Sequence, residues 1–412
     1  MTREGGFLSR PFWTEKKIKI LSWTLIAGVL FHIFTIYISD SERGSLLKRG
    51  DFPAFYSSAM ILRQGLGDRL YDTELLKAVQ NLYWPSFHGG YISSPYPPYV
   101  PAMLLPLAFL PPDAARTVYA VMMIIFLCLA FFVMTRLAPA LKKYKLEAAA
   151  FCLSFFPLTF GVLGGQNISL SMFLYAAMLR TFSKNTKSGD LLCGLCLGLW
   201  FFKPQFAALF VFYFVLARCW RIVATALSVA GIYYLIAAVF TGPAWPLAWF
   251  KAAQEAAALD FPFNQTKMIS ITGFLKAMMG FFPAHPQWGS VAGLAGAFIS
   301  ALLFLGLAWL YHSIGQLKGE GKRARLQALL EFTAPVALLI SPHALFYDLP
   351  LCLVPYFKRI RLDTDGKISL FIFVTAFTTV AIIYKEMLIF QPAFFLLLAS
   401  AAFFYSRLNP KF

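Results

Sequence analysis

Long apolar segments alternate with short polar ones along almost the whole chain. The apolar segments lie near residues 18–38, 115–135, 147–162, 167–182, 190–203, 205–218, 222–241, 291–315, 327–341, 343–357, 368–384 and 387–405. A helix needs about 20 apolar residues to cross the hydrocarbon core of a bilayer, and several of these segments reach that length. The pattern predicts an all-α polytopic membrane protein with about twelve transmembrane helices.

Three pairs of apolar segments are short for a full crossing and are joined by only a few polar residues. They are 147–162 with 167–182, 190–203 with 205–218, and 327–341 with 343–357. Such hairpins do not reach the far surface of a bilayer. We expect them to form the floor of a cavity that opens to the outer side, where irregular backbone is shielded from lipid.

The basic residues fall in clusters between the apolar segments. The clusters are Lys16-Lys17, Lys142-Lys143, Lys184 with Lys187, Arg218 with Arg221, Lys322-Arg323-Arg325 and Lys358-Arg359-Arg361. The positive-inside rule places all of them in the cytoplasm if the Pro-rich segment 99–111 lies in the membrane plane or is re-entrant. Residues 1–17 are then a cytoplasmic tail, both termini are cytoplasmic, and 18–38 is an uncleaved first span.

Two outer loops are long, at residues 39–114 and 242–290. The first contains an amphipathic pattern that ends at Gly65 and a second one around 73–83. The apolar face of the first pattern comprises Phe52, Phe55, Tyr56, Ala59 and Leu62. Helices of this kind lie beside lipid head groups, so we expect juxtamembrane helices on the outer side of a single transmembrane domain that covers residues 1–412.

Composition supports this class. Of the 412 residues 59% are hydrophobic and 13% charged, whereas a soluble protein has about a quarter charged residues. The net charge of +17 lies in the clusters between spans, which argues against nucleic acid as a partner. Cys193-Gly-Leu-Cys196 lies inside an apolar helical pattern, which favours helix packing over a redox or zinc site.

Under this topology the unusual polar residues gather at the outer ends of the spans. They are Asp51, Gly164-Gly165-Gln166-Asn167, Lys203-Pro204-Gln205, Asn264-Gln265-Thr266, Ser341-Pro342-His343, Tyr347 and Asp348. Polar groups at membrane depth are costly, so such a gathering indicates a functional site.

Several of these residues also have structural interpretations. Asp51 precedes Phe52-Pro53 and suits a helix N-cap. Gln166 and Asn167 could cap the span that follows them. We therefore keep both the capping role and the functional role open for these three residues.

The same holds for the other polar positions. Lys203 could extend its amine to the interface, and His343 could be a satisfied packing histidine. Asp348 could pair with a lysine or cap locally. For Asp68 and Asp72, which flank Leu70-Tyr71, we favour structural roles.

Seven motifs occur in one order along the chain. They are DFxxFYxxA from Asp51, GxGDRLYD, SPYPPYVPAMLLPLAFLP, GGQNxSL, FKPQ, NQT and SPHxxxYDLPLxLVP. This order resembles the GT-C superfamily of integral-membrane glycosyltransferases, most closely glycosyltransferase family 87. That family includes polyprenol-phosphate-mannose-dependent mannosyltransferases, and the resemblance covers roughly residues 50–355.

The resemblance implies a sugar donor on a polyprenyl phosphate, used at the outer face with inversion at the anomeric carbon. The family's catalytic aspartate corresponds to Asp51 and its active-site histidine to His343. Some GT-C relatives carry an acidic pair, but Gly50 precedes and Pro53 follows Asp51 here. We therefore expect no cofactor and no metal.

The residue types suit this chemistry. A sugar phosphate is already activated, so the protein needs a base for the acceptor hydroxyl and donors for the departing phosphate. Asp51 is the candidate base. The candidates for binding the substrate or the donor phosphate are Lys203, Lys267, Gln166, Asn167, Gln205, Tyr347, Asp348 and Tyr96. The segment Tyr96-Pro97-Pro98-Tyr99 could form a groove for the prenyl tail.

The leading hypothesis is thus a transferase that moves mannose or another hexose from polyprenyl phosphate to a lipid-linked or glycan acceptor. The resemblance favours a bacterial inner membrane, although an endoplasmic reticulum membrane has the same topology. The alternative is a transporter or flippase of a lipid-linked sugar, which predicts inverted repeats and midplane charges. An acyltransferase centred on His343 would leave Asp51 without a role.

Overall fold

The computed structural model describes residues 50–85, 90–142, 145–264, 267–279, 287–319, 321–359 and 392–405, with six positions between 17 and 28. The predicted cytoplasmic tail, most of the first span and the segment 368–384 lie outside these residues. Within the described residues the chain is helical throughout, and its one β-type contact is an isolated bridge between Met268 and Leu345. The all-α prediction is confirmed.

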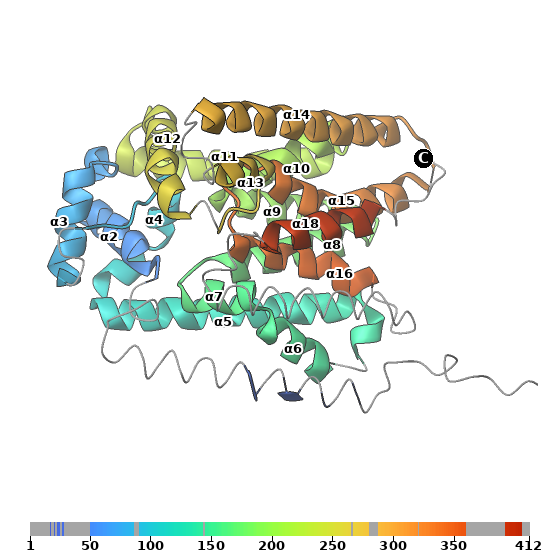
Figure 1. The fold of residues 1–412 in the computed structure, drawn as a ribbon, viewed down its shortest axis with the longest axis horizontal. Coiled ribbons are helices and arrows are strands. Elements are labelled where there is room, and N and C mark those ends of the chain that lie inside the picture. Colours follow the sequence, from blue (N-terminus) through green and yellow to red (C-terminus); the bar gives the residue numbers. More distant parts are fainter. Residues whose placement is uncertain are drawn as a thin grey trace, which may run out of the picture.

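The helices follow the predicted apolar segments closely (Figure 1). They are α2 (Phe52–Arg63), η2 (Gly67–Arg69), α3 (Thr73–Tyr83), α4 (Tyr99–Met103), η4 (Leu105–Phe109), α5 (Pro112–Leu137), η5 (Pro139–Lys142), α6 (Lys145–Ser154), α7 (Phe156–Leu163), α8 (Ile168–Phe182), α9 (Lys187–Leu199), η6 (Trp200–Phe202), α10 (Pro204–Leu216), α11 (Trp220–Thr241), α12 (Trp245–Asn264), α13 (Ile271–Met279), α14 (Gln287–Gly315), α15 (Gly321–Ile340), η8 (Phe346–Cys352), α16 (Leu353–Arg359) and α18 (Pro392–Tyr405).

Three helices are long and apolar enough to cross a membrane: Pro112–Leu137, Trp220–Thr241 and Trp288–Gly315. The pair α6 and α7 is bent by 69° and passes the same test when taken as one broken span. These helices identify an integral membrane protein. The described residues therefore contain three candidate spans, or four with the bent pair, and the expected total of about twelve stays a prediction.

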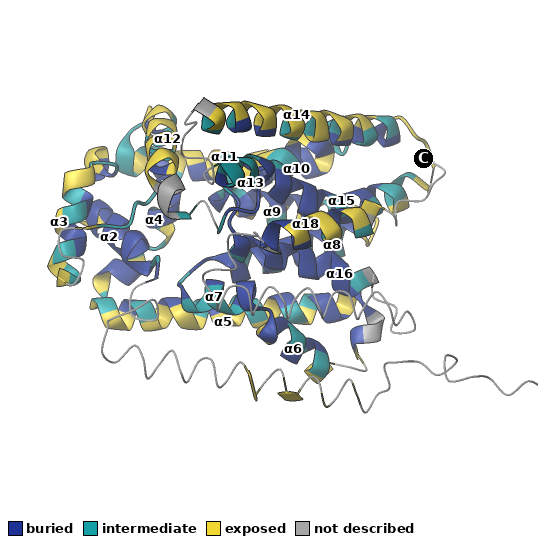
Figure 2. Cartoon of the chain, in the orientation of Figure 1, coloured by how far each residue is buried: buried dark blue, intermediate teal, exposed yellow. Residues whose placement is uncertain are grey.

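Short helices occupy the interior of the bundle. Helices α8, α9 and α10 contain 15, 13 and 13 residues, which corresponds to about 20 Å, against a hydrocarbon core of about 30 Å. Figure 1 shows them between the longer α5 on one side and α14 on the other, and Figure 2 shows α8 as largely buried, whereas α9 also has many exposed residues. Two of the predicted short hairpins therefore consist of short helices, whereas the third contains α15, which has 20 residues. The cavity above them stays a prediction.

The outer segment that follows Gly50 differs from its predicted amphipathic form. Every residue of α2 from Phe52 to Leu62 is buried, although the sequence pattern assigned it one apolar face. The second face is covered because α2 packs among α3, η4 and the start of α5. The segment 99–111 forms α4 and η4, each of five residues, and neither is long enough to cross a membrane.

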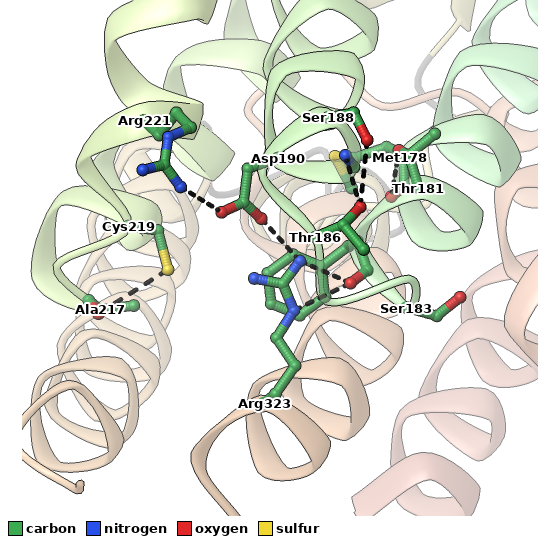
Figure 3. A network of polar contacts seen from close by, with 12 residues as sticks. Met178, Thr181, Ser183, Thr186, Ser188, Asp190, Ala217, Cys219, Arg221 and Arg323 are labelled. Carbon is green, nitrogen blue, oxygen red and sulfur yellow. Dashed lines mark hydrogen bonds and ion pairs between the residues drawn. The ribbon is translucent and has the colours of Figure 1, made fainter. Parts of the chain in front are cut away.

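A polar network ties the helices together at one end of the bundle (Figure 3). The Arg323 guanidinium of α15 donates to the carbonyl of Phe182 at 2.8 and 2.5 Å and to Asp190 of α9 at 2.8 Å. Its Cζ lies 3.5 Å from the centroid of the Phe182 ring. Arg221 of α11 reaches the same carboxylate at 3.4 Å. Two of the basic clusters found in the sequence therefore meet at one end of the molecule.

We predict that Arg323→Met lowers the free energy of unfolding by about 2–3 kcal/mol, because one side chain serves a carbonyl and a half-buried carboxylate. Arg221→Met is the matched control, since Arg221 is 48% exposed and its contact is longer; it should cost about 0.5 kcal/mol or less. Unfolding of both purified variants in detergent micelles measures the difference. Equal losses would contradict the role assigned to Arg323.

Candidate active site

Asp51 is fixed by a close contact between two backbone segments. Its backbone N–H donates to the carbonyl of Gly164 at 2.9 Å. Gly50 has a φ of +45°, and a Cβ at this position would lie 2.3 Å from the Gly164 carbonyl oxygen. Gly165 has a φ of +69°, and a Cβ there would come within 3.3 Å of the Phe52 nitrogen. Only glycine combines these backbone angles with so close an approach.

The Asp51 carboxylate is directed by this contact toward the turn before α8. Gln166, which is buried, donates its side-chain amide to Asp51 Oδ2. The Asp51 side chain makes no cap hydrogen bond to α2, and the Asn167 side chain makes none to α8. The side-chain capping interpretation of Asp51 and Asn167 is therefore wrong, because Asp51 accepts from Gln166 and Asn167 donates to Tyr96. Asp51 itself remains partly exposed.

Tyr96 lies beside this carboxylate. Its hydroxyl accepts a hydrogen bond of 3.2 Å from the Asn167 side-chain amide, and its ring centroid lies 5.0 Å from that of Phe55. The backbone around it is anchored as well: Tyr71 donates to the Tyr96 carbonyl at 2.9 Å, and Trp249 of α12 donates to the carbonyl of Pro95 at 3.0 Å.

The electrostatic surroundings keep Tyr96 protonated. Burial raises the pKa of the Tyr96 phenol well above its usual value, and the negative charge of Asp51 raises this pKa further. The Asn167 hydrogen bond acts in the opposite direction, and Asp348 adds a smaller upward contribution. The pKa of Tyr96 responds to both carboxylates, so its phenol lies within electrostatic range of Asp51 and of Asp348.

Lys203 and Asp348 form a buried ion pair. Lys203 Nζ lies 2.6 Å from Asp348 Oδ1, and the two side chains are 5% and 6% exposed. The other oxygen of Asp348 accepts from the backbone N–H of Leu345 at 3.3 Å. Lys203 therefore does not extend to the interface, and the alternative interpretation of this lysine is wrong. For Asp348 the lysine pair and the local cap are both confirmed.

The outer loop that follows α12 lies against the turn that contains His343. Met268 and Leu345 form the isolated antiparallel bridge, and Ile269 donates to the carbonyl of Ala344 at 3.0 Å. Lys267 is half-buried next to this bridge and donates to Asn264 at 2.9 Å. His343 is half-buried in the facing turn. The bridge thus joins the outer-loop segment that carries Lys267 to the turn that carries the candidate histidine.

The remaining candidates differ in placement. Tyr347 is half-buried in η8, and its Cβ lies 3.4 Å from the position that a Cβ on Gly161 would take. Gln205 is exposed in the first turn of α10, and none of its contacts in the described part of the chain joins it to the other candidates. The structure therefore pairs Asp51 with Gln166, Tyr96 with Asn167 and Lys203 with Asp348, and joins the segments that carry Lys267 and His343. That all of these candidates form one site stays a prediction, and Gln205 lies apart from the pairs.

The sequence-based search missed the residues that support Tyr96. Phe55, Tyr71 and Trp249 contact this segment, and their only signals were their places in DFxxFYxxA, in GxGDRLYD and in an aromatic outer helix. The structural role expected for Asp72 is confirmed, because its carboxylate caps α3 and pairs with Arg69. Across the residues that the structure describes, no three His, Cys, Asp or Glu side chains are grouped so that they could bind a metal ion.

The fold defines a class, a helical integral membrane protein, in which pairs of polar candidates connect separate segments of the chain. A family model matches residues 95–342, more than half of the chain, and its description is glycosyltransferase family 87. The chain belongs to this family. The matched range includes Tyr96, Gln166 and Lys203, whereas Asp51 and Asp348 lie outside it. Neither the comparison with curated proteins nor that with solved structures gives a match.

We predict that Gly50→Ala destabilises the protein and displaces Asp51, because the added methyl group meets the Gly164 carbonyl. Gly65→Ala is the matched control: Gly65 has a φ of +74°, but a Cβ there meets no atom within 4 Å. The control should lose about 1–2 kcal/mol from backbone strain alone and keep its activity. Gly50→Ala should lose more stability and also lose sugar transfer, as measured by unfolding and by glycosyl transfer. Matched behaviour of the two variants would refute the backbone contact.

We also predict that Lys203→Met destabilises the protein by about 3–5 kcal/mol, because it leaves the Asp348 carboxylate buried and unpaired. The double variant Lys203→Met/Asp348→Leu removes both charges and should recover a large part of this loss. Unfolding midpoints of the wild type, both single variants and the double variant complete the cycle. Additive losses would show that the pair contributes nothing as a unit.

Proposed function

We propose that this chain is an inverting hexosyltransferase that moves a sugar, mannose or another hexose, from a polyprenyl phosphate to a hydroxyl of a lipid-linked or glycan acceptor. Membership of glycosyltransferase family 87 supports the transfer of a sugar. The observation that carries the rest is the Asp51 carboxylate, which is partly exposed, anchored through its backbone to Gly164 and oriented by Gln166.

In the proposed step the acceptor hydroxyl oxygen attacks the anomeric carbon of the donor. The bond between this carbon and the phosphate oxygen breaks, and its electron pair leaves with the polyprenyl phosphate. The hydroxyl proton passes to Asp51. A single displacement inverts the configuration, so this mechanism needs one carboxylate as base and no covalent sugar intermediate.

Gln166 orients Asp51 for the proposed role as a base. An amide is neutral, so it orients the carboxylate without neutralising it, and the backbone contact at Gly164 fixes the position of the base before substrate binds. Such preorganisation lowers the cost of bringing base and hydroxyl together.

The departing phosphate requires cationic or N–H donors. Lys267 and His343 lie on facing segments joined by the Met268–Leu345 bridge and are the proposed phosphate ligands. Lys203 adds positive charge nearby but is committed to Asp348, so we assign it chiefly to the support of η8. The Tyr96-Pro97-Pro98-Tyr99 segment is the proposed start of the groove for the prenyl tail.

The proposed orientation places this site outside the cytoplasm. Arg221 and Arg323 lie together at one end of the bundle. Helices α8, α9 and α15 each have one end at this network. The turns at Gly164–Asn167, Lys203 and Ser341–Asp348 lie at or beyond the other ends of these helices. The positive-inside rule then assigns the basic end to the cytoplasm and the site to the periplasmic face of a bacterial inner membrane.

We predict that Asp51→Asn lowers the rate of transfer by about 10²–10⁴-fold while the fold is retained, because an amide of the same shape cannot accept the proton. Donor and acceptor lipids from a strain that lacks the gene serve as substrates, and mass spectrometry identifies the product. Unchanged unfolding shows that the loss is chemical. Sustained turnover by Asp51→Asn would disprove the mechanism, and movement of an intact lipid-linked sugar by wild type without transfer would favour a flippase.

A further inference from the structure

Tyr96 and Asn167 contain hydrogen-bonding capacity that the protein itself does not use. Asn167 is 5% exposed and donates its amide to Tyr96, yet its Oδ1 has no hydrogen-bond partner in the part of the chain that the structure describes. The Tyr96 hydroxyl accepts this bond, and its own hydrogen is left for another acceptor. A buried polar atom without a partner is uncommon and calls for an explanation.

The two groups together offer one donor and one acceptor. The phenol can donate, and the amide oxygen can accept. The reverse orientation of the Asn167 amide gives the same result, because Tyr96 would then donate to Asn167 and leave its own oxygen free to accept beside a free N–H. The pair is therefore complementary to a group that both accepts and donates a hydrogen bond, as a sugar hydroxyl does.

The charge of the surroundings argues against a phosphate at this point. The Asp51 carboxylate acts on the Tyr96 phenol, so it would repel an anion at this point. A phosphodiester also has no proton to give to the Asn167 oxygen. A neutral hydroxyl meets neither obstacle.

We propose that Tyr96 and Asn167 form a hydroxyl-recognition pair next to Asp51, in which one sugar hydroxyl accepts from the Tyr96 phenol and donates to Asn167 Oδ1. This proposal rests on the proposed function and deepens it, since it makes the pair a specificity determinant. The hydroxyl belongs to the sugar at the reacting centre, on the donor or on the acceptor, and lies close to the one that Asp51 deprotonates.

The pair is well placed to discriminate among sugars. Phe55, Tyr71 and Trp249 restrain the Tyr96 segment from three directions, while Asn167 starts α8. A site whose polar groups are fixed in advance rejects a substrate that lacks the matching hydroxyl, because those groups then stay unpaired. The identity of the sugar would thus be read by two uncharged side chains.

Steady-state kinetics of Tyr96→Phe test this proposal, because the variant removes the hydroxyl and keeps the ring on Phe55. With the native donor and acceptor lipids, kcat/KM for one of the two substrates should fall about 10- to 100-fold. A rise in the KM for the donor assigns the hydroxyl to the donor sugar, and a rise for the acceptor assigns it to the acceptor. The loss should be constant from about pH 6 to about pH 9, because the raised pKa keeps Tyr96 protonated there.

Asn167→Leu should produce a similar loss for the same substrate, and the double variant should lose no more than about the larger single loss, because both side chains serve one hydroxyl. Tyr234→Phe is the control, since its hydroxyl bonds the Pro243 carbonyl away from the site; it should change kcat/KM less than about 2-fold. If Asn167→Leu does not fold, Tyr96→Phe alone decides.

Unchanged kcat/KM values for both substrates in a folded Tyr96→Phe protein would overturn the pair, as would a loss confined to thermal stability. Neither result touches the proposed function, which is judged by wild type and Asp51→Asn. Absence of sugar transfer by wild type would overturn both proposals together.

Discussion

The candidate site depends on the close approach of the chain before α2 to the turn before α8. The hydrogen bond from Asp51 to Gly164, and the glycines at positions 50 and 165, allow two backbones to touch with no side chain between them. This contact fixes the direction of α2, whose buried residues then form a core with α3, η4 and the start of α5. The outer segment is in this way attached to the transmembrane bundle at the residue that carries the proposed chemistry.

The helices on either side of the Gly164 turn are short. The turn at Gly164 lies between α7, which has eight residues, and α8, which has 15, and both are shorter than α5 and α14. Polar groups placed there are costly unless they are paired. The structure meets this requirement with Gln166 on Asp51 and Asp348 on Lys203. The exceptions, such as Asn167 Oδ1, then stand out as groups directed at something other than the protein.

Much of the helix pattern could be predicted from the sequence, because α5, α11 and α14 are long, apolar and bounded by polar residues. The topology also predicted that Asp51, Gln166 and Lys203 lie at the outer ends of the spans, and the gathering of all three stays a prediction. The hydrogen-bond and ion-pair partners of these residues could not be predicted from the sequence. Asp51 and Gln166 are 115 residues apart, and Lys203 and Asp348 are 145 residues apart; no periodicity connects positions so distant. For the same reason, the full burial of α2 could not be predicted from the sequence. Its second face is covered by η4 and α5, and the local pattern of α2 does not reveal these contacts.

The Lys203–Asp348 pair also limits where phosphate can bind. The charge of Lys203 is largely compensated by the Asp348 carboxylate 2.6 Å away. Moving Lys203 away would leave the carboxylate of Asp348, which is 4% exposed, buried without a cation. The pair therefore acts as a brace between the start of α10 and η8, which in turn positions His343 and the strand-like segment facing Met268. The positive charge available to a leaving phosphate must then come from the other side of that bridge, where Lys267 is bonded only to a neutral amide among its identified contacts. The proposed base and the proposed phosphate ligands thus come from different segments of the chain, and the neutral Tyr96–Asn167 pair joins the Tyr96 segment to the turn before α8.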